Sequence, residues 1–84
     1  MEKNLSLVKD QFKQLPNNIE AEQSVIGSIL VNNDIFDEIN TIISSINFFE
    51  PMHQKIFEAV ESLIYKGMLA NPITLKNYFE DEKD

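Results

Sequence analysis

The stretch from Leu15 to Leu30, LPNNIEAEQSVIGSIL, constrains the fold more than any other part of the chain. A proline and two asparagines precede an apolar run, and asparagine favours helix starts because its side chain accepts a hydrogen bond from a free backbone N–H. Asn17 and Glu20 have the spacing of a capping box, whereas Asn18 alone is an equally suitable cap. Either start predicts a helix that continues to about Asn32.

Three residues inside this helix bear on chemistry and packing. Glu20 and Glu22 lie near the positive end of the helix dipole, and residues two apart on a helix point to different sides. We therefore interpret both as solvated or capping carboxylates rather than as an acid–base pair. Gly27 costs about 1 kcal/mol relative to alanine in a helix interior, and this cost predicts a close approach by another backbone.

Three further segments have the three-and-four spacing of amphipathic helices. One follows the turn at Asn32-Asn33-Asp34 and runs to about Ser44. Another begins at Glu50-Pro51 and ends at Gly67, because proline suits the first helical position and glycine suits a left-handed cap. Thr74 is expected to cap the last helix. The expected inner faces comprise Ile19, Ile26, Ile29, Leu30, Ile35, Ile39, Ile42, Ile43, Ile56, Phe57, Val60, Leu63 and Ile64.

These segments predict an all-α fold, a compact orthogonal bundle of short helices. The length of 84 residues suits one domain. We expect residues 15–84 to form this domain and residues 1–14 to be a mobile or partly helical lead-in, since unanchored termini fray. The lead-in lacks the apolar core of a signal peptide, and no stretch approaches the ~20 apolar residues of a membrane span. A cytoplasmic protein is the expectation.

The charge of the chain argues against nucleic-acid binding. The net charge is −7, there is no arginine, and residues 15–84 have four lysines against twelve acidic residues. Binding to DNA requires clustered cations that displace counterions from phosphates. The aromatic side chains without interleaved cations are therefore expected in the core, with an exposed minority available to a protein partner. These aromatic residues are Phe48, Phe49, Phe57, Tyr65, Tyr78 and Phe79.

Catalytic motifs are equally scarce. The two glycines, Gly27 and Gly67, do not build a phosphate-binding P-loop, which excludes nucleotide hydrolysis by this chain. His53 is the only histidine, with Glu50 one turn away, and we interpret it as a packing or hydrogen-bonding residue. No cysteine or second histidine supplies metal-ligand spacing, so no catalytic, cofactor or metal residue is expected.

The run Pro16 and Ile19-Glu20-Ala21-Glu22-Gln23-Ser24-Val25-Ile26-Gly27 resembles the opening of the N-terminal domain of DnaB-type bacterial replicative DNA helicases. The resemblance extends to about Phe79. Phe48-Phe49 stands at the family's aromatic pair, His53 to Phe57 matches its H-x-x-I-F helix, Gly67 its helix-ending glycine, and Ile73-Thr74-Leu75 its I-T-L segment. The matching positions taken as structural motif residues are Glu20, Glu22, Gly27, Phe48, Phe49, His53, Ile56, Phe57, Gly67 and Thr74.

The resemblance implies a non-catalytic interaction domain that supports the collar of a hexameric helicase. It also implies contacts with other helicase subunits, with primase and with a helicase loader during DNA replication. ATP and Mg²⁺ would bind only in a separate C-terminal domain, so the chain is expected to be a fragment of a longer helicase. The alternatives are a free-standing acidic helical adaptor and a primase-type helicase-binding domain; an enzyme is a third and more distant reading.

Overall fold

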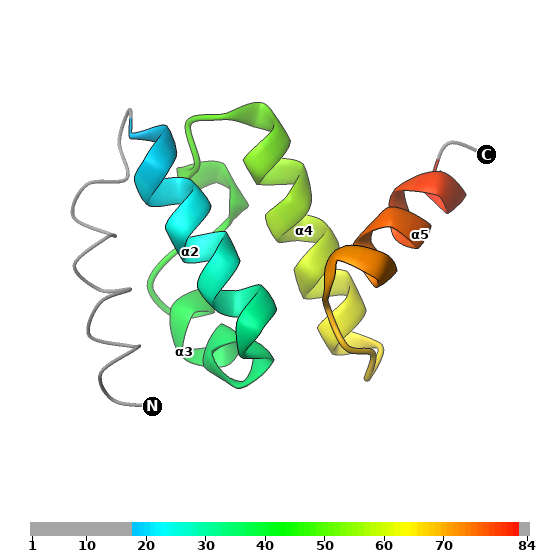
Figure 1. The fold of residues 1–84 in the computed structure, drawn as a ribbon. Helices are drawn as coiled ribbons and strands as arrows, with labels where there is room; N and C mark the ends of the chain where they lie inside the picture. Colours follow the sequence, from blue (N-terminus) through cyan, green and yellow to red (C-terminus); the bar gives the residue numbers. More distant parts are fainter. Residues whose placement is uncertain (1–17, 83–84) are drawn as a thin grey trace.

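The computed structural model describes residues 18–82, and every regular element within that range is helical. In chain order these are α2 (Ile19–Val31), the 3-10 turn η1 (Asn33–Ile35), α3 (Phe36–Asn40), the 3-10 turn η2 (Ser45–Asn47), α4 (Pro51–Tyr65) and α5 (Pro72–Glu82). Helices α2 and α4 lie side by side and begin at the same end of the molecule, while α5 packs on α4 (Figure 1). The prediction of an all-α bundle of short helices is confirmed. The lead-in of residues 1–14 lies outside the described range.

The predicted helix boundaries are correct at three places. Asn18 caps α2, because its Oδ1 accepts the N–H of Ala21 at 2.9 Å; Asn17, the other candidate cap, lies outside the described residues. Pro51 is the first residue of α4. Gly67 follows the end of α4 with φ at +78°, and its N–H donates to the carbonyl of Ile64. This is the left-handed glycine cap that the sequence predicts.

The prediction of one continuous helix to about Ser44 is wrong. The Asn32 side chain accepts the N–H of Asp34, which starts a 3-10 turn, and α3 then lasts only five residues. At its end the Thr41 hydroxyl donates to the carbonyl of Glu38, a local bond that competes with helix continuation. The chain then turns, and Ile42, expected on the inner face, is 53% exposed.

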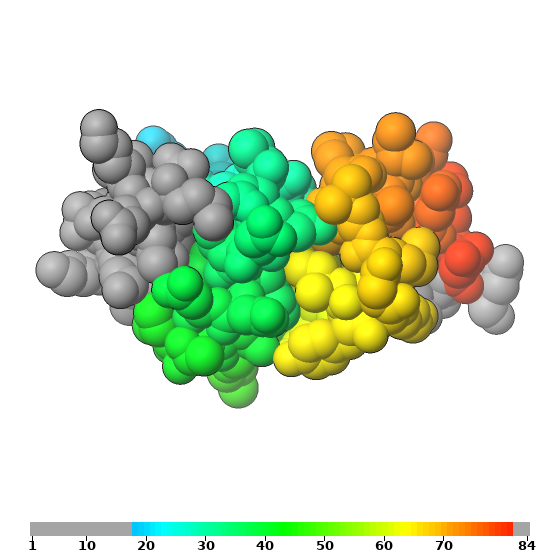
Figure 2. Space-filling model, turned by 90° about the horizontal axis from the view of Figure 1, so that it is seen from below, coloured from blue at the N-terminus to red at the C-terminus, as the bar shows by residue number. Residues whose placement is uncertain are grey.

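The assignment of Thr74 as the cap of the last helix is also wrong. Helix α5 begins two residues earlier at Pro72, and Asn71 is the residue that accepts the N–H groups of Ile73 and Thr74. The Thr74 hydroxyl accepts the N–H of Asn71 in return, which completes a reciprocal capping arrangement. Proline at the first helical position is the signal that favours the earlier start. From below, the segment joining α4 to α5 lies against the residues that follow α2 (Figure 2).

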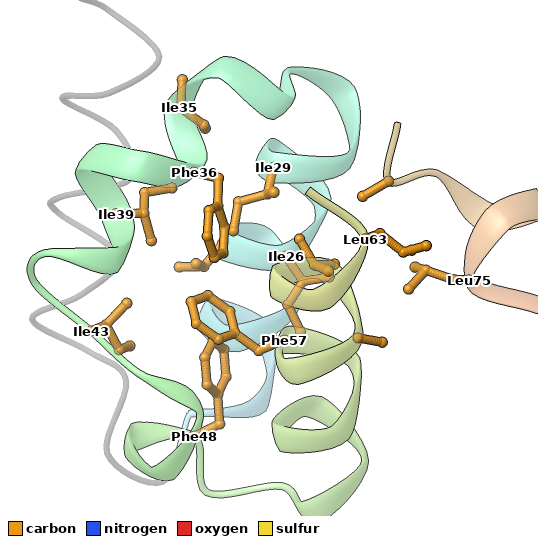
Figure 3. Close-up of a cluster of buried hydrophobic side chains, with 14 of the residues drawn as sticks. Ile26, Ile29, Ile35, Phe36, Ile39, Ile43, Phe48, Phe57, Leu63 and Leu75 are labelled. Atoms are coloured by element: carbon orange, nitrogen blue, oxygen red, sulfur yellow. The ribbon is translucent and has the colours of Figure 1, made fainter. Parts of the chain in front are cut away.

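Three phenylalanines form the centre of the core. The ring of Phe57 on α4 lies 5.4 Å from that of Phe36 and 5.1 Å from that of Phe48, centroid to centroid (Figure 3). All three are at most 1% exposed, which places α3 and the connector before α4 against one side of α4. Ile56 and Ile64 are only partly buried, and Tyr65 is largely exposed. The other buried apolar residues of the described range are Ala21, Val25, Ile26, Ile29, Ile35, Ile39, Ile43, Ala59, Val60, Leu63, Ala70 and Leu75.

Candidate functional site

The most unusual feature of this core is a fully buried carboxylate, that of Glu22 on α2. Its exposed fraction is 0%, and its Oε1 lies 2.7 Å from Nδ1 of His53 on α4. Oε1 also accepts the backbone N–H of Glu50 at 3.2 Å, and Oε2 accepts the N–H of Phe49 at 2.5 Å. The interpretation of Glu22 as a solvated or capping carboxylate is therefore wrong, whereas Glu20 is exposed as expected.

The position of Glu22 on α2 explains its burial. Glu22 precedes Ile26 by four residues and Ile29 by seven, so it lies on the same helical stripe as these buried side chains. His53 has the same relation to Phe57 and Val60 on α4. Where the two helices pack, the carboxylate and the imidazole are brought together inside an apolar environment. A carboxylate only accepts hydrogen bonds, so Nδ1 of His53 bears the proton that is shared with Glu22.

The same contacts control the ionisation of Glu22. Burial by itself would raise the pKa of its carboxyl, because the charged form loses solvation. The hydrogen bond from His53, the N–H groups of Phe49 and Glu50, and the charge of His53 outweigh burial, and together they lower the pKa below its ordinary value of 4.5. The positive end of the α4 dipole lies at the same place and favours a negative charge there. Glu22 is therefore a buried anion held at the start of α4.

This arrangement is suited to structure rather than to catalysis. Both oxygens of Glu22 are engaged by the protein's own donors, and no hydroxyl or thiol nucleophile takes part in these contacts. The interpretation of His53 as a hydrogen-bonding residue is confirmed, with Glu22 rather than the sequence neighbour Glu50 as its partner. Glu50 instead caps α4, since its Oε1 accepts the N–H of Met52 at 3.2 Å.

The contacts of Glu22 determine how the Phe48-Phe49 pair is presented. Nε2 of Gln54 donates to the carbonyl of Phe48 at 2.6 Å, while Glu22 accepts the N–H of the next residue. With the backbone fixed on both sides, the Phe48 side chain enters the core at 1% exposure and the Phe49 side chain points outward at 60% exposure. One member of the pair thus stabilises the fold and the other is accessible to a partner.

A second polar contact joins α2 to the other end of the bundle. The side chain of Asn33 accepts the N–H of Ala70 at 2.7 Å through Oδ1 and donates to the carbonyl of Ala70 at 3.0 Å through Nδ2. Nδ2 also donates to the carbonyl of Ile29 at 2.8 Å. Asn33 thereby fixes the segment between α4 and α5, a role that its place in a predicted turn did not reveal.

Gly27 is not a close-approach site, and that prediction is wrong. Within residues 18–82, a Cβ atom added to Gly27 would meet no atom within 4 Å, apart from its own helix and chain neighbours. Among the described residues, Gly27 instead lines a surface hollow of about 360 Å³ together with Ser28, Val31, Asn32 and Ile35. None of these five residues has an ionisable side chain, and none belongs to the Glu22 contacts.

The structure thus brings together four of the motif residues, Glu22, Phe48, Phe49 and His53, and places Phe57 beneath them. Glu20, Gly27, Gly67 and Thr74 lie elsewhere on the bundle. Sequence reasoning missed the pairing of Glu22 with His53. The available signal was one ionisable residue within each of two apolar stripes, since such groups enter a core only with a partner.

Residues 18–82 contain neither a metal-binding cluster nor a membrane-spanning helix. No group of three or more His, Cys, Asp or Glu side chains within this range is placed to hold a metal ion. Each helix in the same range is too short or too polar to cross a membrane.

Comparison with known proteins gives a consistent result. The family described as DnaB-like helicase N terminal domain matches residues 14–84. The replicative DNA helicase DnaB of Rickettsia typhi is 46% identical over 63 residues, which are 75% of this chain and 13% of that protein. The protein of the same name from Buchnera aphidicola subsp. Baizongia pistaciae is 38% identical over 80 residues, 95% of this chain and 17% of that protein. The chain therefore spans less than a fifth of the length of these relatives. No solved structure matches it.

Proposed function

This chain belongs to the DnaB-like helicase N-terminal domain family, and we propose that it is the interaction domain of a replicative DNA helicase. In this proposal it helps the subunits assemble into a hexameric ring, and it offers surfaces to primase and to a loading factor. The observation that supports the proposal best is the family match over residues 14–84, together with relatives whose printed name is replicative DNA helicase DnaB. The match favours the helicase over the free-standing adaptor and over the primase-type domain.

In this proposal, ATP binding and hydrolysis take place outside this chain. ATP and Mg²⁺ would act in a separate motor domain of the longer protein, because this sequence has no P-loop. Its net charge of −7 and lack of arginine oppose direct contact with phosphates. A cytoplasmic location is part of the same proposal. The domain would act through protein contacts alone.

The decisive experiment compares the complete helicase with a version that lacks residues 1–84. We expect the shortened protein to retain ATP hydrolysis but to form less stable rings in sedimentation and to lose primase from the complex. The isolated chain should bind primase more weakly than the complete N-terminal region, because one small domain offers less than the ~1,200 Å² of buried area that stable interfaces use. Ring stability and primase binding that do not change after the deletion would contradict the proposal.

A further inference from the structure

Three exposed apolar side chains lie close in sequence to the residues that bind Glu22 before α4. They are Ile46, 80% exposed, Phe49, 60% exposed, and Met52, 54% exposed, and we refer to them as the Phe49 corner. Phe49 lies two residues before α4, Met52 is the second residue of that helix, and Ile46 lies on η2, which packs along α4. Single exposed apolar residues are common on proteins, but three such residues within the short stretch from Ile46 to Met52 call for a reason.

The Phe49 corner is pre-organised. The N–H of Phe49 is bound by the buried Glu22 carboxylate, and the carbonyl of Phe48 is bound by Gln54. On the adjoining turn the hydroxyl of Ser45 donates to Oε2 of Glu58 at 3.0 Å, which ties η2 to α4. A surface fixed in this way loses little conformational entropy when a partner binds, and an exposed aromatic residue is a frequent anchor in protein interfaces.

The charge around the Phe49 corner indicates the chemistry of the partner. The sequence from Asn18 to Gln54 contains neither lysine nor arginine. The carboxylates of Glu50 and Glu58 flank the corner, and Lys55 is the first cation that follows it. The same region of a second copy would bring carboxylates rather than cations to this corner, and nucleic acid would bring phosphates.

We propose that the Phe49 corner docks a cationic amphipathic helix of a partner protein. The apolar stripe of that helix covers Ile46, Phe49 and Met52, and its lysine or arginine side chains face Glu50 and Glu58. This inference rests on the proposed function as an interaction domain, and it names one surface and one class of partner for it. The area is small, so the expected affinity is weak and dependent on salt.

The test uses two synthetic helical peptides of about 20 residues, long enough to be helical in water. Both have the same leucine stripe, but one has lysine and the other glutamate at the flanking positions. The isotope-labelled chain is titrated with each peptide and followed by amide NMR spectra. The lysine peptide should bind at least about tenfold more tightly than the glutamate peptide and should shift the amides of residues 46–52 most strongly.

Matched variants decide which surface is used. Phe49→Ser and Met52→Ser should each weaken binding of the lysine peptide, Phe49→Ser by about tenfold. Leu69→Ser, at a side chain of similar exposure (63%) at the other end of the bundle, should change it by less than about twofold. Phe49 donates to Glu22 through its backbone N–H, which serine also has, so the amide signals outside the corner should be unchanged in Phe49→Ser. If those signals do change, the affinity of Met52→Ser for the lysine peptide decides the question instead.

Three results would overturn the inference. They are equal binding of the two peptides, largest shifts at Leu69 and Ile73, and self-association of the chain that Phe49→Ser abolishes. The last result would identify a second copy as the occupant. Any of them would leave the proposed function standing if removal of residues 1–84 still weakens the helicase ring, so the two proposals fail separately.

Discussion

One polar side chain near the start of α2 and another just after its end attach this helix to distant segments, but the two contacts differ in chemistry. At the first end, the charged carboxylate of Glu22 accepts from two backbone N–H groups and from His53 on α4. At the second, the neutral amide of Asn33 pairs with both backbone groups of Ala70 before α5. A buried charge costs far more to leave without partners than a buried amide does. The first contact should therefore matter more to global stability, and the second more to the local position of α5.

Replacing Glu22 by alanine should have the largest effect. The change leaves the N–H groups of Phe49 and Glu50 and the His53 imidazole without their acceptor in a buried site, and we expect a loss of about 3–5 kcal/mol of unfolding free energy. Urea denaturation followed by circular dichroism measures it. Glu20→Ala, at the exposed carboxylate two residues earlier, is the matched control and should cost less than about 1 kcal/mol. Similar losses in both variants would show that the buried contacts of Glu22 contribute no more to stability than an exposed carboxylate does.

Replacing Asn33 by alanine should rank second. The loss should be about 1–3 kcal/mol, because the N–H and C=O of buried Ala70 lose a neutral partner. Amide hydrogen exchange should accelerate most from Gly67 to Thr74, while Phe49 and Glu50 keep their protection. Asn40→Ala, which removes an exposed bond to the Tyr65 hydroxyl, should change stability by less than about 0.5 kcal/mol. If exchange instead accelerates evenly across the bundle, the Asn33 contact and the Glu22 contact stabilise the same cooperative unit, which would contradict the predicted local effect.

Acid titration should separate the charged contact from the neutral one. The folded-state pKa of Glu22 lies below its ordinary value of 4.5, so the carboxylate stabilises the fold above that pH. This stabilisation is lost as the pH falls below about 4.5 toward the folded-state pKa. The effect should be smaller than that of Glu22→Ala, because a protonated carboxyl keeps its place and an acceptor oxygen. Urea midpoints measured against pH should fall less steeply for Glu22→Gln than for the parent and for Asn33→Ala. Parallel curves for all three would contradict the assignment.

The difference between the two ends also explains what the sequence could predict. Caps at Asn18, Pro51 and Gly67 and the apolar stripes of α2 and α4 were predictable, because they depend on residues within about four positions of one another. Glu22 pairs with residues 27 to 31 positions away, and Asn33 with a residue 37 positions away. Such contacts depend on how the helices pack. Periodicity within one helix indicates that Glu22 is buried, but it does not indicate which group lies opposite.

The failure at α3 has a more local cause. Ile35, Ile39 and Ile43 have helical spacing and are all buried. The helix nevertheless consists of only five residues, Phe36–Asn40. Side-chain hydrogen bonds from Asn32, Thr41 and Asn47 with nearby backbone groups replace helical bonds on both sides. The buried positions were predictable from spacing, whereas the number of residues in the helix depended on which polar side chain competed successfully for the backbone.

The smallest predicted effect is a gain in stability, and it tests the whole length of α2. A methyl group at Gly27 meets no atom of the described part of the chain within 4 Å, so Gly27→Ala should raise the unfolding free energy by about 0.5–1 kcal/mol through helix propensity alone. Gly67→Ala is the control: its site is equally open, but φ is +78°, so the same substitution should destabilise by about 1 kcal/mol. Because Gly27 lies inside α2, between Glu22 and the last helical residue Val31, its gain should slow hydrogen exchange at both ends of α2. A gain limited to one end would show that α2 does not transmit stability between the two contacts, and a loss would restore the close-approach reading of Gly27.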